Sequence, residues 1–416
     1  MRPGAPVSAP SFRDFLFASD HPRVAEIRGL TAREYAEHAT ADSFAGPMIE
    51  GWRKLYPQPF TGITNDGVRR EGLFPLAPAQ PGEEAPTGDM AAAARKLLGA
   101  LAPAQARTLR YAVDAQEWQS WANPEFMQHD TGLRLDELDA PVRDAILGVV
   151  EASLSPAGFE LVRNLMRING FLGDLVELPL LMNEFSYNFA LYGEPSETEP
   201  WGWQLFGHHA ALNCLVAGTQ LVISPVFMGA EPDGIDDGPH RGVKVFKERI
   251  ALARRLMGAL PADLRARAVT YPSMVDPGMP EGRLHAGDER HLGGCFQDNR
   301  VIPYEGILVA GMPREARDLL DALVDDFIAY LPDGPRAARH REIREHHGET
   351  FFSWIGGWEG DEAFYFRLQS PVVVLELDHH TGVFLGNDEP APFHMHTVVR
   401  TPNGNDYGRE LVRQGR

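Results

Sequence analysis

The chain has 416 residues, of which 44% are hydrophobic and 23% are charged, a composition typical of a globular protein with at least one large core. Its formal net charge of −19 argues against a nucleic-acid partner, because phosphate binding requires clustered Lys and Arg side chains. No apolar run approaches the roughly 20 residues that cross a bilayer, and residues 1–20 lack an apolar signal segment. We therefore expect a cytoplasmic protein with no membrane partner.

The cysteine content fits a reducing compartment. Cys214 and Cys295 are too few for a disulfide framework, and neither belongs to a CxxC pair. Cys214 lies within an apolar run, so we expect a core residue there rather than a nucleophile.

The first segment with a distinct composition is residues 76–89, LAPAQPGEEAPTGD, which is rich in Pro, Gly and acidic residues and has no apolar periodicity. This pattern predicts an exposed loop or linker. It separates an N-terminal arm, residues 1–75 with one helix over 31–55, from a main α+β domain, residues 90–416.

Helices are predicted where apolar residues recur at three- and four-residue spacing. These stretches are residues 90–101, 103–111, 139–165, 243–260, 313–331 and 335–347. The third stretch should form two helices, because Ser155 and Pro156 supply an N-cap followed by proline in the first turn.

Strands are predicted in two groups that lie far apart in the sequence. Residues 211–216 and 220–226 are β-rich and flank a turn at Gly218, which indicates a hairpin. Near the C-terminus, β-rich runs cover residues 362–368, 372–377 and 393–400. The expected fold class is α+β, with an antiparallel or mixed sheet built from both groups and covered by helices.

Four histidines form the candidate metal site. His208 and His209 lead into the first hairpin, and His394 and His396 lead into the last extended run. Histidines two apart on a strand point to the same face, so the second pair suits one ion. Adjacent histidines point to opposite faces of a regular strand, which favours His209 as the third ligand, although a bend at Gly207 would admit both.

This ligand set suggests catalysis rather than structural metal binding. Neutral imidazole suits zinc, copper, iron and nickel, and three histidines leave a coordination position open. Glu376 lies in the apolar run 372–377, where a charge requires a partner. It could be a ligand, a general base or the acceptor that orients a ligand imidazole.

The other histidines carry weaker signals. His379 and His380 precede Thr381-Gly382, a pattern typical of a surface turn at the end of a strand. Four more stand in loops or at helix ends with no partner at a telling spacing: His285, His291, His346 and His347.

Several blocks of sequence resemble a known family. They are Phe60–Thr64, Gly72–Phe74, Glu117–Pro124, Leu191–Ser196, Pro200–Trp203, Gly207–His209, Pro225–Pro232, His394–Arg400 and Asn405–Gly408. Together they resemble the domain-of-unknown-function family numbered three thousand five hundred, over most of the chain. The resemblance implies that the two histidine pairs belong to a shared signature. It also implies that Arg400, Asn405, Asp406 and Tyr407 cluster near them.

Three functions fit these features. The first is an oxidoreductase in which iron or copper activates oxygen on a small organic substrate, within an apolar pocket of Trp201, Trp203, Trp354 and Trp358, although such aromatics are more commonly core. The second is a zinc hydrolase with metal-bound water as nucleophile. The third is a non-enzymatic metal- or ligand-binding protein.

The candidate catalytic residues have their clearest roles in the hydrolase hypothesis. Glu376 or Asp406 would move a proton, Arg400 would stabilise a developing oxyanion, and Tyr407 completes the set. The GxSxG, GxxxxGK[ST] and HExxH motifs of common hydrolases, nucleotide-binding proteins and zinc proteases are absent from the sequence. The sequence does not indicate an oligomeric state.

Overall fold

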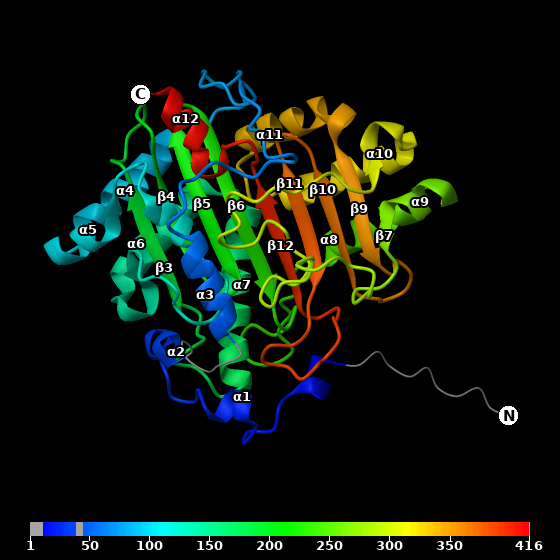
Figure 1. Ribbon diagram of the computed structural model, residues 1–416. Helices are drawn as coiled ribbons and strands as arrows, with labels where there is room; N and C mark the ends of the chain where they lie inside the picture. Colours follow the sequence, from blue (N-terminus) through cyan, green and yellow to red (C-terminus); the bar gives the residue numbers. More distant parts are fainter. Residues whose placement is uncertain (1–10, 39–44, 416) are drawn as a thin grey trace.

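The computed structural model describes residues 11–38 and 45–415 (Figure 1). The helices of these residues are α1 Pro22–Ala25, α2 Ala32–His38, α3 Gly46–Leu55, α4 Thr87–Ala100, α5 Pro103–Leu109, α6 Ala140–Ser153, α7 Pro156–Leu175, α8 Lys247–Ala259, α9 Ala262–Ala268, α10 Arg314–Phe327, α11 Asp333–Glu345 and α12 Arg409–Gln414. None of them is long and apolar enough to cross a membrane.

The strands form one mixed sheet. They are β1 Arg110–Tyr111, β2 Leu133–Arg134, β3 Tyr187–Tyr192, β4 Trp201–Gly207, β5 Ala210–Ala217, β6 Gln220–Ala230, β7 Val269–Tyr271, β8 Ile307–Leu308, β9 Phe351–Gly356, β10 Phe364–Gln369, β11 Val374–His379 and β12 Met395–Arg400. The order is β1-β3-β4-β5-β6-β12-β11-β10-β9-β7, with β2 paired to β3 and β8 to β9.

The prediction of one sheet from two distant strand groups is confirmed. Strands β3 to β6 form an antiparallel meander, and β9 to β12 form a second one. The two groups join where β6 pairs with β12 in antiparallel register, with Gly229 opposite His396. Among the pairings of named strands in the described residues, only the short pairings β1–β3 and β7–β9 are parallel.

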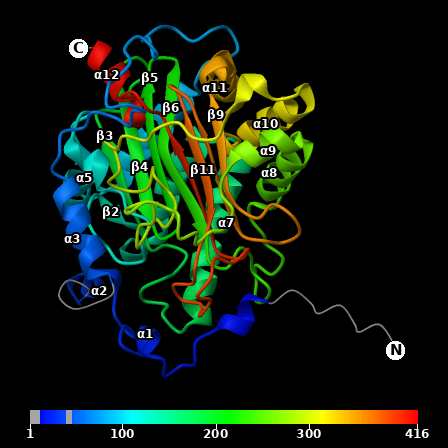
Figure 2. The same ribbon diagram turned by 45° about the vertical axis from the view of Figure 1, so that its right-hand side comes forward.

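The two faces of the sheet have different coverings, as Figures 1 and 2 show. Helices α4, α6, α7, α8 and α10 lie on one face, where the alternate side chains of β4 (Trp201, Trp203 and Leu205) enter the largest hydrophobic core. This alternation follows from the two-residue period of a strand. The helix pair predicted within 139–165 is α6 and α7, and the Ser155 hydroxyl accepts a hydrogen bond from the Gly158 amide at 2.9 Å.

The other face is covered by the arm and by irregular chain. Helix α3 packs through Ile49 and Trp52 onto a second core, which includes residues of β5, β6 and β12. The long segment between β7 and β8 also crosses this face and hydrogen-bonds to β11 and β12. The polar side chains that β11 and β12 direct to this face are therefore enclosed between the sheet and this segment.

The N-terminal residues differ in detail from the sequence prediction. The arm contains α1, α2 and α3 rather than one helix, and residues 39–44, within the expected helix, lie outside the described residues. Residues 76–86 form a largely exposed loop, while α4 already begins at Thr87. The arm lies against the main body, because Thr64 forms a parallel bridge with Val301.

Candidate metal centre

His208 and His209 form the turn between β4 and β5, rather than part of a strand. His209 has a φ of 62°, in the left-handed region that few non-glycine residues adopt. The two rings stack with their centroids 3.8 Å apart. Nδ1 of His208 lies 2.8 Å from Oδ1 of Asn169, so His208 is held against α7.

His394 directly precedes β12, and His396 is the second residue of that strand. Gly229 lies opposite His396 on β6, and its missing side chain leaves space for two imidazoles. A Cβ atom at Gly229 would stand 2.5 Å from Cδ2 of His396 and 2.9 Å from Cδ2 of His209. A glycine at this position of β6 is therefore what allows the rings from the two strand groups to meet.

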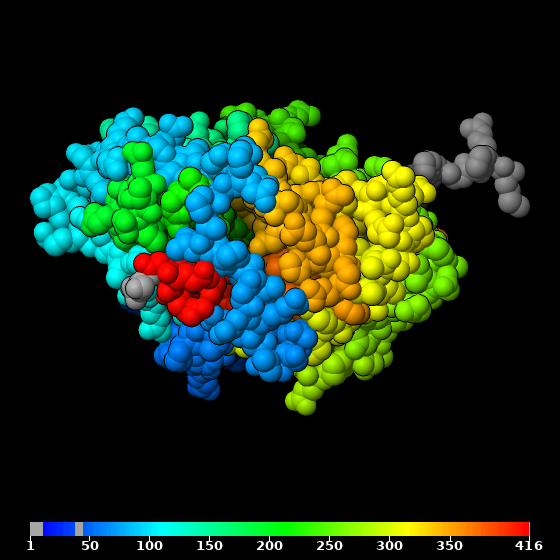
Figure 3. Space-filling model, turned by 90° about the horizontal axis from the view of Figure 1, so that it is seen from above, coloured from blue at the N-terminus to red at the C-terminus, as the bar shows by residue number. Residues whose placement is uncertain are grey.

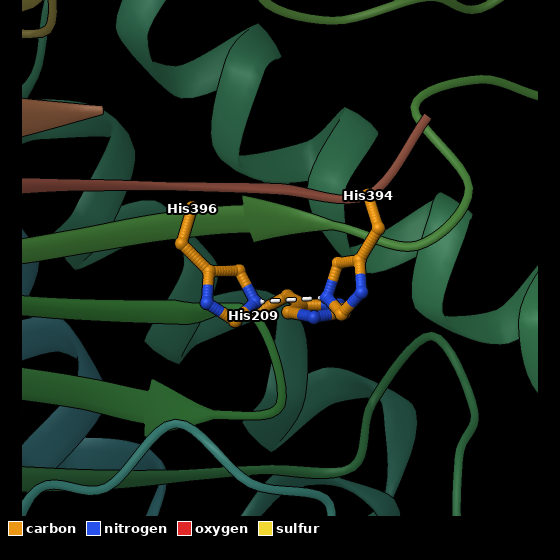
Figure 4. A group of neighbouring side chains, drawn as sticks. All are labelled: His209, His394 and His396. Atoms are coloured by element: carbon orange, nitrogen blue, oxygen red, sulfur yellow. Dashed lines mark hydrogen bonds between the residues drawn. The ribbon is translucent and has the colours of Figure 1, made fainter. Parts of the chain in front are cut away.

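The structure brings His209, His394 and His396 together as the sequence predicts (Figure 4). One ligand atom from each lies within 4.8 Å of the others, and the Nε2 atoms of His394 and His396 are 3.1 Å apart. Two imidazole nitrogens on one zinc ion, each about 2.0–2.1 Å from it, are roughly 3 to 3.4 Å apart. The side chains are 3%, 0% and 5% exposed, so the site is shielded from bulk water. His208 is not part of this group.

The protonation state of these rings suits metal binding. Nδ1 of His394 lies 2.6 Å from the Thr381 carbonyl oxygen, to which it donates, so Nε2 presents a lone pair. Nδ1 of His209 and Nδ1 of His396 are buried without a hydrogen-bond partner. Burial, reinforced by the neighbouring histidines, holds the pKa of all three rings well below the ordinary value. They are thus neutral at physiological pH, the form that binds metals.

Glu231 is a buried carboxylate beside the site that the sequence reasoning missed. Its oxygens accept hydrogen bonds from the backbone amides of residues 383–385, and Oε1 lies 3.8 Å from Nδ1 of His394. Burial raises its pKa to about 7. The only sequence signal was a glutamate directly after the apolar run of β6. The contacts show that it fixes the loop whose Thr381 carbonyl orients His394.

His291 and His380 extend the cluster, and the prediction that His379 and His380 lie in a surface turn is wrong. His379 and His380 do not form a surface turn, because they are 0% and 3% exposed. His379 faces the helix-covered side, where Nδ1 lies 2.8 Å from the Phe364 carbonyl oxygen. His380 and the fully buried His291 have ligand atoms that lie within 4.8 Å of one another and of a ligand atom of His396. Sequence spacing gave no signal for His291, because a long irregular segment carries it to the sheet.

Glu376 anchors that irregular segment. Its carboxylate accepts hydrogen bonds from the Leu292 and Gly293 amides at 2.9 and 2.8 Å and from the Tyr365 hydroxyl at 2.6 Å. Oε2 lies 3.7 Å from Nδ1 of His291. The sequence left three roles open for Glu376: a metal ligand, a general base, or an acceptor that orients an imidazole. These contacts fit the third role best.

Arg400, Asp406 and Tyr407 come together with one another but not with the histidines. The Arg400 guanidinium and the Tyr407 hydroxyl both donate to Asp298, at 2.8 and 2.9 Å, and Arg400 lies 3.5 Å from Asp406. Arg400 is four residues along β12 from His396, so their Cα atoms are about 13 Å apart. The expectation that this group lies beside the histidines is therefore corrected: it lies towards the opposite end of β12.

A cavity of 490 Å³ opens at that opposite end, beyond the Arg400 group. Its lining includes the beginning of β6, Tyr330, Arg339 and Thr401. Figure 3 looks down on this end of the molecule, where α12, the chain around residue 75 and α11 meet. The cavity and the histidine cluster thus occupy opposite ends of the same strands.

The tryptophans expected around the metal lie elsewhere. Trp201, Trp203 and Trp354 belong to the core beneath the helices, and Trp358 packs against that core. The aromatic neighbour of the cluster is Phe227, whose ring centroid lies 4.9 Å from that of His396. Cys214 is buried in the same core as those tryptophans, as predicted.

The fold and the site define an α+β protein with a buried polyhistidine cluster where the two halves of a mixed sheet meet. The chain belongs to the family described as Protein of unknown function (DUF3500), whose model matches residues 83–409. No curated protein and no solved structure matches the chain. All the histidines of the cluster lie within the matched region.

Proposed function

We propose that this protein is a metal-dependent enzyme in which His209, His394 and His396 hold a transition-metal ion. The observation that carries this proposal is the convergence of three neutral, buried imidazoles, each with a nitrogen within 4.8 Å of the others and two of them with an unpartnered Nδ1 atom. An all-nitrogen donor set favours copper, iron, zinc or nickel over magnesium or calcium, which prefer oxygen ligands. With three protein ligands, one coordination position remains for a reactant.

Burial favours redox chemistry over hydrolysis. The three ligand side chains are at most 5% exposed, which suits a small apolar reactant such as dioxygen better than the docking of a large hydrolytic substrate. A bound iron or copper ion would supply the redox chemistry, with dioxygen as the oxidant of a small organic substrate. The chain itself would exclude water and hold the ligand rings in their neutral form.

The surrounding residues support the ligands by fixing their orientation. The Thr381 carbonyl selects the tautomer of His394, and Glu231 holds the loop that carries Thr381. Gly229 provides the space in which His209 reaches β12. Partners of this kind typically change metal affinity by about 10- to 100-fold when they are removed. A cytoplasmic location is part of the proposal, supported by two cysteines that are both unpaired.

Metal analysis tests the proposal. The protein is purified without added metal, and its metal content is measured by mass spectrometry and by absorption and electron paramagnetic resonance spectra. We expect stoichiometric iron or copper, which His209→Ala, His394→Ala and His396→Ala should each deplete. His379→Ala is the matched control, because it removes a buried histidine from the other face of the sheet.

The other outcomes are equally informative. Stoichiometric zinc would overturn the redox assignment and favour a hydrolase, in which a zinc ion lowers the pKa of bound water toward about 7. Equal metal content in the native protein and all three variants would overturn the site itself. Metal binding without turnover of any oxidisable substrate would leave a metal-binding protein rather than an enzyme.

A further inference from the structure

The imidazoles of His291, His380 and His396 form a second group of converging ligand atoms, all within 4.8 Å of one another. All three side chains are 5% exposed or less. Both ring nitrogens of His291 are buried and neither has a partner within hydrogen-bond distance, since Oε2 of Glu376 stands 3.7 Å from Nδ1. Each nitrogen of an imidazole carries either a lone pair or an N–H. Burying both nitrogens without hydrogen-bond partners is unfavourable. A ligand for His291 would remove this penalty.

His396 belongs to both groups and has two nitrogens to offer. Its Nε2 faces His394, and Figure 4 shows its Nδ1 on the side of the ring away from His394. If Nε2 binds one metal ion, the neutral ring must carry its proton on Nδ1, where no acceptor is available. A second metal ion on the Nδ1 side would replace that unpaired proton.

The carboxylates near His380 are better explained as an ion-pair network than as metal ligands. Asp378 accepts hydrogen bonds from the backbone amide and Nε of Arg290, at 2.9 and 2.6 Å. Glu289 accepts from Arg290 and from the amide and hydroxyl of Thr381. A cation bound by Glu289, Asp378 and His380 would therefore compete with a guanidinium already in place.

These same carboxylates would support a cation held by the imidazoles. Oδ2 of Asp378 lies 3.2 Å from Nε2 of His380, where a carboxylate commonly orients a metal-bound imidazole. Asp288 is 1% exposed, and neither of its carboxylate oxygens has a hydrogen-bond partner. Burial raises its pKa, so a cation held by the neighbouring imidazoles would stabilise its charged form. The negative charge needed beside a second cation is thus already buried there.

We propose that His291, His380 and His396 form a second metal subsite, so that each chain binds two transition-metal ions that share His396 as a bridging ligand. The proposal deepens the proposed function, since it rests on a first ion at His209, His394 and His396. A two-metal centre stores two one-electron equivalents within one site. This suits a reaction in which dioxygen accepts electrons in pairs.

Zinc stoichiometry provides the direct test. The full-length protein, stripped of metal, is titrated with zinc alone in equilibrium dialysis, and bound zinc is measured by mass spectrometry. We expect two ions per wild-type chain, one in His291→Ala, one in His209→Ala, and at least a tenfold weaker affinity for both in His396→Gln. His379→Ala should keep two. Circular dichroism restricts the comparison to folded variants.

The variants separate failure of this inference from failure of the proposed function. Suppose that the wild type binds one zinc ion, that His291→Ala still binds it and that His209→Ala does not. This result would overturn the second subsite and leave the first intact. If instead His209→Ala still binds one zinc ion and His291→Ala binds none, the first site would be overturned and with it the shared centre. Two ions in the wild type that are both kept by His291→Ala would also overturn the second subsite.

A spectroscopic measurement on the wild-type protein avoids dependence on variants. Two copper(II) ions joined through one imidazole are magnetically coupled. Copper(II) titration should therefore give an electron paramagnetic resonance signal that grows with the first equivalent and weakens or broadens with the second. A signal that doubles without any coupling would refute the bridging role of His396.

Discussion

Glu376 provides a sharp test of how the irregular segment is held on the sheet. Oε1 accepts from the Leu292 amide and the Tyr365 hydroxyl, while Oε2 accepts from the Gly293 amide. In Glu376→Gln, the amide oxygen can take the place of Oε1, but the amide nitrogen then faces the Gly293 N–H. One charge-assisted hydrogen bond is lost, and two donors face each other in a buried site.

The loss of stability caused by Glu376→Gln can be worked out from hydrogen-bond energies or from the pKa shift of Glu376, and the two values are similar. A hydrogen bond to a charged group contributes about 1.5–3 kcal/mol and an unsatisfied buried donor costs about 1–3 kcal/mol, so we expect a loss of about 3–5 kcal/mol. Burial raises the pKa of Glu376, but His291, Arg367 and Tyr365 outweigh it and lower the pKa from 4.5 to about 2. A shift of this size corresponds to about 3 kcal/mol of stability.

Urea unfolding followed by tryptophan fluorescence measures the loss at pH 7. Glu151→Gln, at an exposed position of α6, is the control and should change the free energy of unfolding by less than about 0.5 kcal/mol. Because the folded-state pKa of Glu376 lies below its ordinary value, its contribution is complete above pH 4.5 and is lost as the pH falls toward 2. The wild type and Glu376→Gln should therefore converge in stability over this range. If Glu376→Gln lowered the free energy of unfolding at pH 7 by less than about 1 kcal/mol, Glu376 would not hold the segment through a buried hydrogen-bond network.

Three further substitutions probe the site and its surroundings. Gly229→Ala places a Cβ atom against His209 and His396, and metal titration should show at least a tenfold weaker affinity; unchanged affinity would contradict the close packing. Gly99→Ala is its control, because this exposed position of α4 has space for a methyl group, and thermal unfolding should show a gain of about 0.5–1 kcal/mol. Arg400→Met leaves buried carboxylates unpaired and should cost about 3–5 kcal/mol in denaturant unfolding. Its metal content per folded chain should not change, and a loss of metal would place Arg400 in the centre after all.

Local sequence patterns predicted the elements of this fold well. Two-residue alternation and three-to-four-residue spacing identified the hairpin β5–β6, the strands β10 to β12 and the helix pair α6–α7. The single sheet followed from a general argument, since two strand groups that share one chain and one set of helices bury most apolar surface together. Patterns of this kind depend on neighbours in sequence, which is why they succeed for strands and helices.

The candidate site was predictable only where neighbours in sequence are also neighbours in space. His394 and His396 share a face of β12 by strand periodicity alone. His209 joins them because a turn places it opposite β6, whereas the sequence left both a regular strand and a bend at Gly207 open. His291 could not be found this way, because it lies in irregular chain that Glu376 and Asp378 hold through backbone amides. Backbone donors leave no trace in residue identities.

The position of the centre connects metal binding to assembly of the sheet. His209 belongs to the first strand group and His394 and His396 to the second, and in the part of the chain that the structure describes the strands of the two groups pair only through β6 and β12. The three candidate ligands, separated by nearly 190 residues, converge only after that pairing forms, so the proposed metal ion would bind the joined sheet and not its halves. The free energy of metal binding would therefore add to the stability of the β6–β12 junction, by an amount that grows with the logarithm of the affinity of the folded state. Any substitution that weakens the junction should weaken metal binding even when every ligand remains.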